Sequence, residues 1–290
     1  MREEVISALT AFLKAKENLS EHAALPLETK TLQQFLRAGP SRESQSAVAQ
    51  TKQSLAAPQA AEPAKPVING ELPMQIDPRI TLPQGSKLSR WQWLKDLVLH
   101  CPTCLSHVHP GKKVVFGSGN LDADVFFCGE APGADEEIQG EVFVGRAGQL
   151  LTKIIEAMGI KRSDVYIGNI MNWRPETPNM IGNRPPTQKE MEFCLPYLKA
   201  QVEIVQPKVI VALGATAVNG LLGHDPKRRM RECRGKWFSF ENIPLLITYH
   251  PSYLLRNATK EAKRTVWEDM LHLMEFLEMP ISPRQRQYFL

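Results

Sequence analysis

Short apolar runs alternate with longer helical patterns between residues 125 and 277, and this alternation restricts the fold more than any other feature of the chain. Runs typical of buried strands cover residues 125–128, 165–170, 208–213 and 245–249. Helical patterns cover residues 147–158, 188–205 and 215–222, and a last one lies near 260–277. Strands that alternate with helices form a parallel sheet covered on both faces. We therefore expect an α/β fold, a three-layer αβα sandwich around a short, mainly parallel four-stranded sheet.

The aromatic residues divide the chain into unequal parts. Phe12 and Phe35 are the only aromatic residues before Trp91. Residues 41–70 are rich in Ala, Ser, Gln and Pro, a composition that buries too little apolar surface to offset its ordering entropy. We expect a short helical element at 1–38, a flexible linker at 39–87, a globular domain at 88–279 and a C-terminal tail at 280–290.

The composition excludes several classes of protein. The chain has 290 residues, of which 43% are hydrophobic, so global disorder is excluded. Its apolar runs are too short to span a bilayer and no signal-peptide pattern opens the chain, so we expect no membrane association and a cytoplasmic location. Five cysteines argue against a disulfide framework and leave metal ligation or buried thiols.

Polar residues follow the predicted strands at one edge of the sheet, where open parallel sheets bind ligands. Gly129, Glu130 and Ala131 follow the first strand, Asn169 ends the second, and His250 follows the fourth. Each has an ordinary structural interpretation: Asn169 as a loop cap, His250 as a satisfied core histidine, Glu130 as a solvated turn residue. Independent structural roles would not be expected to place Glu, Asn and His at three strand ends of one sheet, so we interpret them as a site.

Six sequence blocks at these positions resemble the uracil-DNA glycosylase superfamily, and within it family 4. The blocks, in chain order, are GEAPG at 129–133, FVGRAGQLL at 143–151, YIGN at 166–169, WRP at 173–175, NRP at 183–185 and HPSYLLR at 250–256. The resemblance covers roughly residues 101–276. It implies a DNA repair enzyme, a monofunctional hydrolase that flips deoxyuridine out of DNA, cleaves its N-glycosidic bond, and leaves uracil and an abasic site.

The resemblance also implies roles for individual residues. His250 would donate to the departing uracil anion, and Glu130 and Glu136 would lie near the water and the sugar. Gly129, Ala131, Phe143 and Asn169 would bind the flipped base, Phe143 by stacking and Asn169 by hydrogen bonds that select uracil. Ser252, Tyr253, Leu254 and Arg256 would contact DNA, with Leu254 as part of a wedge. The alternative for Leu254 and for the next residue, Leu255, is packing at the start of the last helix.

The cysteines depart from the family pattern. Family 4 enzymes carry a [4Fe–4S] cluster on four cysteines, and Cys101, Cys104 and Cys194 match three of them, whereas the third position in the chain is Trp173. A cluster prefers four thiolates. We therefore expect no cofactor to be required for the chemistry, and the sequence leaves open a bound cluster, a cluster-free relative, and a cramped zinc site that includes His107 and His109.

The expected partner is DNA that contains uracil. The net charge of +4 conceals a polarised domain, because residues 119–160 hold eight acidic and two basic residues, whereas residues 223–264 hold ten basic and four acidic. We interpret the basic stretch as a DNA-facing surface, with a solvated face as the alternative. We expect a monomer of bacterial type associated with the nucleoid, with residues 1–38 as a docking element for a protein partner or as an inert extension. The alternative functions are a uracil-DNA or abasic-site binding protein with little turnover and, on weaker grounds, a nucleoside or nucleotide hydrolase.

Overall fold

A single mixed sheet forms the centre of the part of the chain that the computed structural model describes, residues 80–177 and 182–290. Six strands lie in the order β1-β3-β2-β4-β6-β5. The four in the middle are mutually parallel: β3 (Tyr166–Asn169), β2 (Val125–Gly129), β4 (Val209–Leu213) and β6 (Ile243–Thr248). The edge strands β1 (Ser118–Gly119) and β5 (Trp237–Phe240) pair antiparallel with β3 and β6.

The expected α/β sandwich is confirmed, but the count of four strands needs correction to six. The four predicted strands form the parallel centre of the sheet, and the two additional strands are its edges. β1 has only two residues, both exposed, and three of the four residues of β5 are exposed. Neither edge therefore carries the buried apolar run by which a strand is recognised in a sequence.

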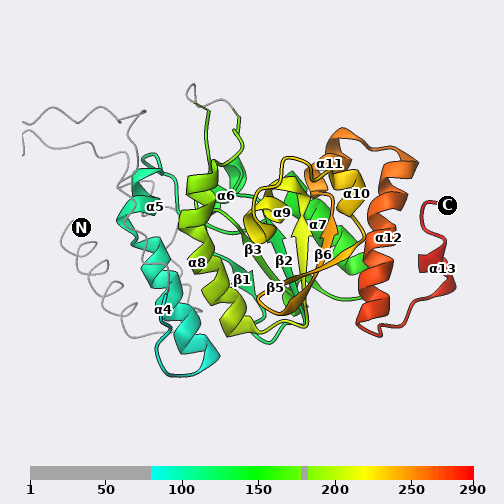
Figure 1. Ribbon diagram of the computed structural model, residues 1–290, viewed down its shortest axis with the longest axis horizontal. Helices are drawn as coiled ribbons and strands as arrows, with labels where there is room; N and C mark the ends of the chain where they lie inside the picture. Colours follow the sequence, from blue (N-terminus) through cyan, green and yellow to red (C-terminus); the bar gives the residue numbers. More distant parts are fainter. Residues whose placement is uncertain (1–79, 178–181) are drawn as a thin grey trace, which may run out of the picture. The chain divides into compact units, whose positions relative to one another are not determined.

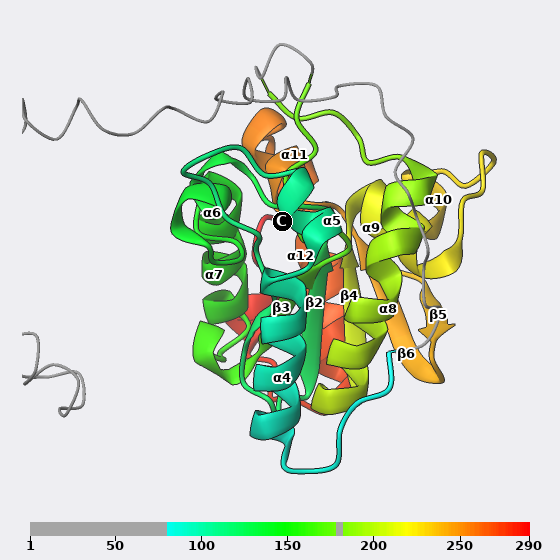
Figure 2. The same ribbon diagram turned by 90° about the vertical axis from the view of Figure 1, so that its left-hand side faces the viewer.

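Helices cover both faces of the sheet, as Figures 1 and 2 show. Alternate side chains of β2 enter different cores: Phe126 and Cys128 join one, and Val125 and Phe127 join the other. The first core is covered by α4 (Lys87–Leu99), α5 (Pro102–Ser106), α8 (Gln188–Val205) and α9 (Gly214–Leu222), and the second by α7 (Arg146–Ala157) and α12 (Lys260–Phe276). Every residue of β2 and β4 is buried because each of these strands is covered on both sides.

Short elements complete the described part. They are α6 (Ala134–Gln139), the 3₁₀ turn η2 (Arg162–Asp164), α10 (Met230–Cys233), α11 (Pro251–Arg256) and α13 (Pro283–Arg286). The short helices α10 and α11 lie near the same end of the sheet (Figure 1). Among the described helices, none has both the length and the apolarity that a membrane span requires.

Residues near the expected domain boundaries contact the folded body. Ile80 and Leu82, within the predicted linker, pack against the first core. In the predicted tail, the Trp267 indole N–H of α12 donates to the carbonyl of Gln285 at 2.6 Å, and the Tyr288 ring lies 5.1 Å from that of Trp267. The helical element predicted for 1–38 and the linker up to residue 79 lie outside the described residues.

Candidate active site

A cavity of about 540 Å³ opens at the carboxyl ends of the parallel strands. All of the predicted catalytic, base-binding and DNA-binding residues except Gly129 and Leu254 line it. Its walls include Glu130 and Ala131 after β2, Phe143 before α7, Asn169 at the end of β3, Gly214 at the start of α9, and His250 with Ser252, Tyr253 and Arg256 around α11. This convergence follows from the topology, because parallel strands all end at the same edge.

Gly129 allows an aromatic ring and an amide to approach the end of β2. It lies opposite Asn169 in the register of β2 and β3. A Cβ atom at Gly129 would collide with the Asn169 side chain and would stand 2.5 Å from Cζ of Phe143. Asn169 is buried, and its Oδ1 has no hydrogen-bond partner among the described residues. An unsatisfied buried amide oxygen is costly, so this atom is available to an N–H group of a ligand in the cavity.

Phe143 stands in the left-handed region of the backbone, with φ of +52°, which is uncommon for a residue with a side chain. Its ring is buried and lies 5.6 Å from the His250 ring. The loop that carries it is held by Glu136 of α6, whose carboxylate accepts N–H bonds from Val144 at 2.9 Å and Gly145 at 2.8 Å. The second oxygen of Glu136 accepts from the N–H of Gly133 at 3.1 Å. Glu136 thus lines the cavity beside Phe143, but its oxygens are directed at main-chain donors.

His250 caps the N-terminus of α11, and its ring faces the cavity. Its Nδ1 lies 3.2 Å from the Ser252 N–H and 2.8 Å from the Ser252 hydroxyl. A main-chain N–H can only donate, so Nδ1 is an acceptor and the imidazole proton is on Nε2. Burial, and then the nearby Arg256, lower the pKa of His250 to about 4. Gly214 lets β4 end against this histidine, because a Cβ there would stand 2.9 Å from Cβ of His250.

The residues that follow His250 divide between the cavity and the interior. Tyr253 stacks on Tyr249, with ring centroids 4.3 Å apart, and both rings line the cavity. Leu254 is buried and packs with Ala262 and Val266 of α12, so the structure gives it the packing alternative named above and not a surface position. Leu255 and Arg256 are exposed. Leu255, for which packing at the start of the last helix was the alternative to a place in the wedge, is therefore the leucine nearer to solvent.

Glu130 follows β2 directly and is half-buried at the wall of the cavity. Its main-chain carbonyl accepts from the N–H of Met171 at 3.0 Å, which joins the segment after β2 to the segment after β3. Its carboxylate makes no hydrogen bond or ion pair to another described residue, so it is available to a ligand or a water molecule in the cavity. Ala131, partly buried against the first core, contributes a methyl group to the same wall.

Sequence reasoning missed a buried carboxylate that is hydrogen-bonded to the last residue of β6, the strand that precedes His250. Asp269 of α12 is fully buried; its Oδ2 accepts from the Thr248 hydroxyl at 2.7 Å, and its Oδ1 accepts from the Arg234 guanidinium at 2.9 Å. Burial raises the pKa of Asp269 to about 6. Thr248 stands two residues before His250, so this network anchors the end of β6. Nothing in the sequence near Asp269 signals it, because its partners are distant along the chain.

The three predicted metal-ligand cysteines lie together, and none of them lines the cavity. Cys101 is the N-cap residue of α5, Cys104 lies in α5 and Cys194 lies in α8. All three are buried, and the pKa of Cys104 is raised by burial and by the neighbouring Cys194 and Cys101. Trp173, which is 1% exposed, belongs to the same core as these cysteines. His109, considered above as a zinc ligand, instead contacts Glu176 at 2.9 Å. In the described part of the chain, no group of three or more His, Cys, Asp or Glu side chains is arranged to hold a metal ion.

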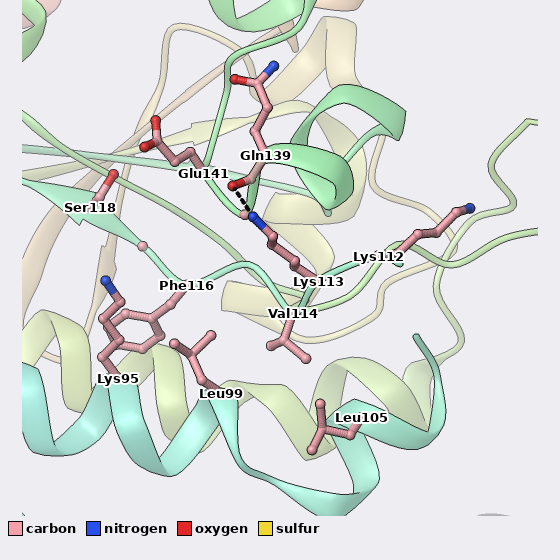
Figure 3. Close-up of a pocket in the computed structure, with 12 residues that line it drawn as sticks. Lys95, Leu99, Leu105, Lys112, Lys113, Val114, Phe116, Ser118, Gln139 and Glu141 are labelled. Atoms are coloured by element: carbon pink, nitrogen blue, oxygen red, sulfur yellow. Dashed lines mark hydrogen bonds between the residues drawn. The ribbon is translucent and has the colours of Figure 1, made fainter. Parts of the chain in front are cut away.

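A second cavity, of about 550 Å³, lies between α4 and the segment that leads into β1 (Figure 3). Leu99, Val114 and Phe116 form part of its wall, and the Lys113 ammonium donates to the carbonyl of Gln139 at 3.1 Å across it. It shares no lining residue with the strand-end cavity and has no convergent buried polar groups. The strand-end cavity is therefore the candidate active site.

Comparison with known proteins agrees with this geometry. Residues 116–271 match the model of the uracil DNA glycosylase superfamily, a span that includes every wall segment described above, and the chain belongs to that superfamily. Among its relatives, a type-4 uracil-DNA glycosylase of Thermotoga maritima is 42% identical over 188 residues, which cover 64% of this chain and 93% of that protein. A type-4 uracil-DNA glycosylase of Pyrobaculum aerophilum is 39% identical over 171 residues, which cover 57% of this chain and 84% of that protein.

Proposed function

We propose that this chain is a monofunctional uracil-DNA glycosylase, which hydrolyses the N-glycosidic bond of deoxyuridine in DNA. The observation that carries the proposal is the convergence of Asn169, Phe143 and His250 on one cavity. These groups supply a hydrogen-bonding edge, an aromatic face and a neutral donor around a space of about 540 Å³. A base buried in DNA cannot reach such a cavity, so the nucleotide must first leave the base stack.

His250 would stabilise the leaving group. Cleavage of the bond between C1′ and N1 leaves positive charge on the deoxyribose and negative charge on uracil. Because the Ser252 donors occupy Nδ1, the imidazole presents Nε2–H, which would donate to uracil O2 as that oxygen gains charge. A pKa of about 4 keeps this donor neutral at physiological pH. The histidine would therefore act as a hydrogen-bond donor and not as an acid.

Asn169 would select the base. Its unpartnered Oδ1 would accept from uracil N3–H, and its amide N–H would donate to uracil O4. Cytosine has a lone pair at N3 and an amino group at position 4, so both hydrogen bonds would be lost. Phe143, held by Glu136, would stack on the face of the base. Discrimination of this kind is strong because a mismatched base leaves buried polar groups unpaired.

Glu130 would assist the water that attacks C1′. Its carboxylate lies at the wall of the cavity and is not engaged by another described residue. A carboxylate there would stabilise the developing oxocarbenium charge and orient the water, with Glu136 acting indirectly through the loop that it holds. We propose no cofactor for these steps. We further propose that the protein works as a cytoplasmic monomer at the nucleoid, with residues 1–38 available to a protein partner.

The test is incubation of the purified chain with a uracil-containing oligonucleotide, followed by alkaline cleavage of abasic sites. We expect strand scission by the wild type, a loss of about 10²–10³-fold in single-turnover rate for Asn169→Ala and for His250→Ala, and no loss for the exposed control His224→Ala. Tight uracil-DNA binding without scission would instead establish the binding-protein alternative. Scission that survives in both cavity variants would disprove the assigned site.

A further inference from the structure

We propose that this chain folds and acts without an iron–sulfur cluster. The indole of Trp173, packed against the rings of His107 and Phe193, occupies the position at which family 4 enzymes have the remaining cysteine. The resemblance to family 4 implies a cluster on four cysteines, of which this chain keeps Cys101, Cys104 and Cys194. The residues present do not fit that group. Only the activity readout below rests on the proposed function; the metal content does not.

The donor set is incomplete in three dimensions as well as in sequence. Cys101 accepts from the Tyr197 hydroxyl at 3.7 Å and lies beside Cys104 and Cys194. Each of the other two cysteines belongs to a different element. Cys128 lies within β2 and contacts the carbonyl of Gly129, and Cys233 lies in α10 and contacts the carbonyl of Met230, both at 3.7 Å. Neither is placed as the missing ligand.

Trp173 stands at the sequence position of the missing cysteine, and its ring is packed against two other rings. Its ring lies flat on His107, with centroids 4.6 Å apart and planes at 8°, and it meets Phe193 at 6.0 Å. Phe193 adjoins Cys194, and His107 lies three residues after Cys104, so the stack joins the same two cysteine segments. An indole offers an N–H donor and no lone pair to a metal, and it cannot replace a thiolate.

Ion pairs fix the two described segments that flank residues 178–181. Arg174, next to Trp173, contacts the buried Glu137 at 2.7 Å. In the segment before α8, Arg184 makes a bidentate contact with the buried Glu190 of α8, at 2.6 and 2.8 Å. Bidentate pairs of this kind fix geometry as well as charge. Ion pairs thus connect the segment after β3 to α6, and the segment before α8 to α8, without a metal.

The test measures iron and acid-labile sulfide in the full-length chain, purified without oxygen from iron-supplied cells. A ferredoxin with four cysteine ligands, prepared in parallel, serves as the positive control. We expect the wild type to contain neither iron nor sulfide in proportion to protein, and its melting temperature and uracil excision to be unchanged by an iron chelator. Trp173→Cys supplies the fourth thiolate and should gain iron and sulfide in equal amounts on reconstitution. Trp173→Ser, which opens the same space without a ligand, should gain none.

Two results would overturn the proposal. One is a wild type that carries iron and sulfide in equal amounts and loses them in Cys104→Ser. The other is a wild type that carries iron and sulfide and loses them in His107→Ala, which would make the His107 Nε2 the fourth ligand. This nitrogen is buried and has no hydrogen-bond partner among the described residues. If the Trp173 variants fail to fold, the wild-type iron measurement still decides. An inactive, folded wild type that takes up no iron or sulfide on reconstitution would refute the proposed function and leave standing the inference that the chain folds without a cluster.

Discussion

Two donors from Ser252 meet the Nδ1 atom of His250, and this contact determines which form of the imidazole faces the cavity. The same side chain in water would be an equilibrium of tautomers and would titrate near 6.5. Burial and Arg256 lower its pKa to about 4. The tautomer of His250 is therefore set by Ser252, and its pKa is set by burial and by Arg256.

We expect the rate of uracil excision attributable to His250 to be constant above about pH 5 and to fall as the pH drops through about 4. The sign follows from the lowered pKa: the neutral donor exists above it, and protonation below it forces Ser252 off Nδ1. Single-turnover rates between pH 4 and 8, with folding checked by circular dichroism, provide the measurement. In Ser252→Ala the loss of the hydroxyl should slow excision about tenfold, equivalent to one hydrogen bond. An acidic limb centred near 6.5 in the wild type would contradict the argument.

Glu136 is a positioning residue, since each of its carboxylate oxygens accepts from main-chain N–H groups. We expect Glu136→Gln to lose at least one of these three bonds, because the amide keeps only one acceptor oxygen. The unpaired N–H should lower the free energy of unfolding by about 1–3 kcal/mol. Excision should fall as well, because the Phe143 loop is released. Urea denaturation and excision assays test this, with Glu141→Gln on the same loop as the control that should change neither.

At the level of elements, α11 has one side for packing and one for solvent. Leu254 is 7% exposed, whereas Leu255 is 38% exposed. We expect Leu254→Ala to lower the free energy of unfolding by about 2–4 kcal/mol, as for other leucines removed from a core. Leu255→Ala should leave stability nearly unchanged and weaken binding to uracil-DNA if this residue enters the base stack. Equal effects of the two variants on stability would show that α11 is not oriented in this way.

The ends of helices show how far local sequence reaches. The predicted helix 188–205 has the observed bounds, and its start is fixed by reciprocal bonds between Thr187 and Glu190, at 3.3 Å and 2.7 Å. This capping box is visible in the sequence as Thr-x-x-Glu before an apolar pattern. The edge strand β5 has no comparable signal, because it is recognised only by its pairing with β6.

For the molecule as a whole, some of the basic residues in the stretch 223–264 are engaged by other groups of the protein. Arg228 donates to the carbonyl of Gly223, Arg234 pairs with Asp269, and Arg264 donates to the carbonyl of Tyr288. Arg256, by contrast, is exposed at the rim of the cavity. The phosphate-binding surface that we propose is therefore narrower than the charge count of the sequence indicates.

We expect the affinity for uracil-DNA to fall with salt, and Arg256→Ala to reduce the slope of log K against log salt by about one. The physical reason is the loss of one phosphate contact and of the counterions that it releases. Fluorescence anisotropy across a salt series measures both slopes. Lys208→Ala, which removes an exposed lysine at the opposite end of β4, is the control. A control slope reduced by the same amount would show that the DNA does not lie at the Arg256 rim.

The sequence alone determined the central strands, the helices α7, α8, α9 and α12, and the strand-end positions of Glu130, Asn169 and His250, because apolar periodicity and strand ends are local properties of the chain. It did not predict α4, whose residues show little amphipathic pattern. Only the tertiary structure decided the two edge strands, the burial of Leu254, the carboxylate of Asp269 behind β6, and the stack of His107 on Trp173. Each of these depends on contacts between segments far apart in sequence, and a contact of that kind leaves no periodic pattern in either segment. Packing across such distances decides which of two equivalent-looking side chains is available to the substrate.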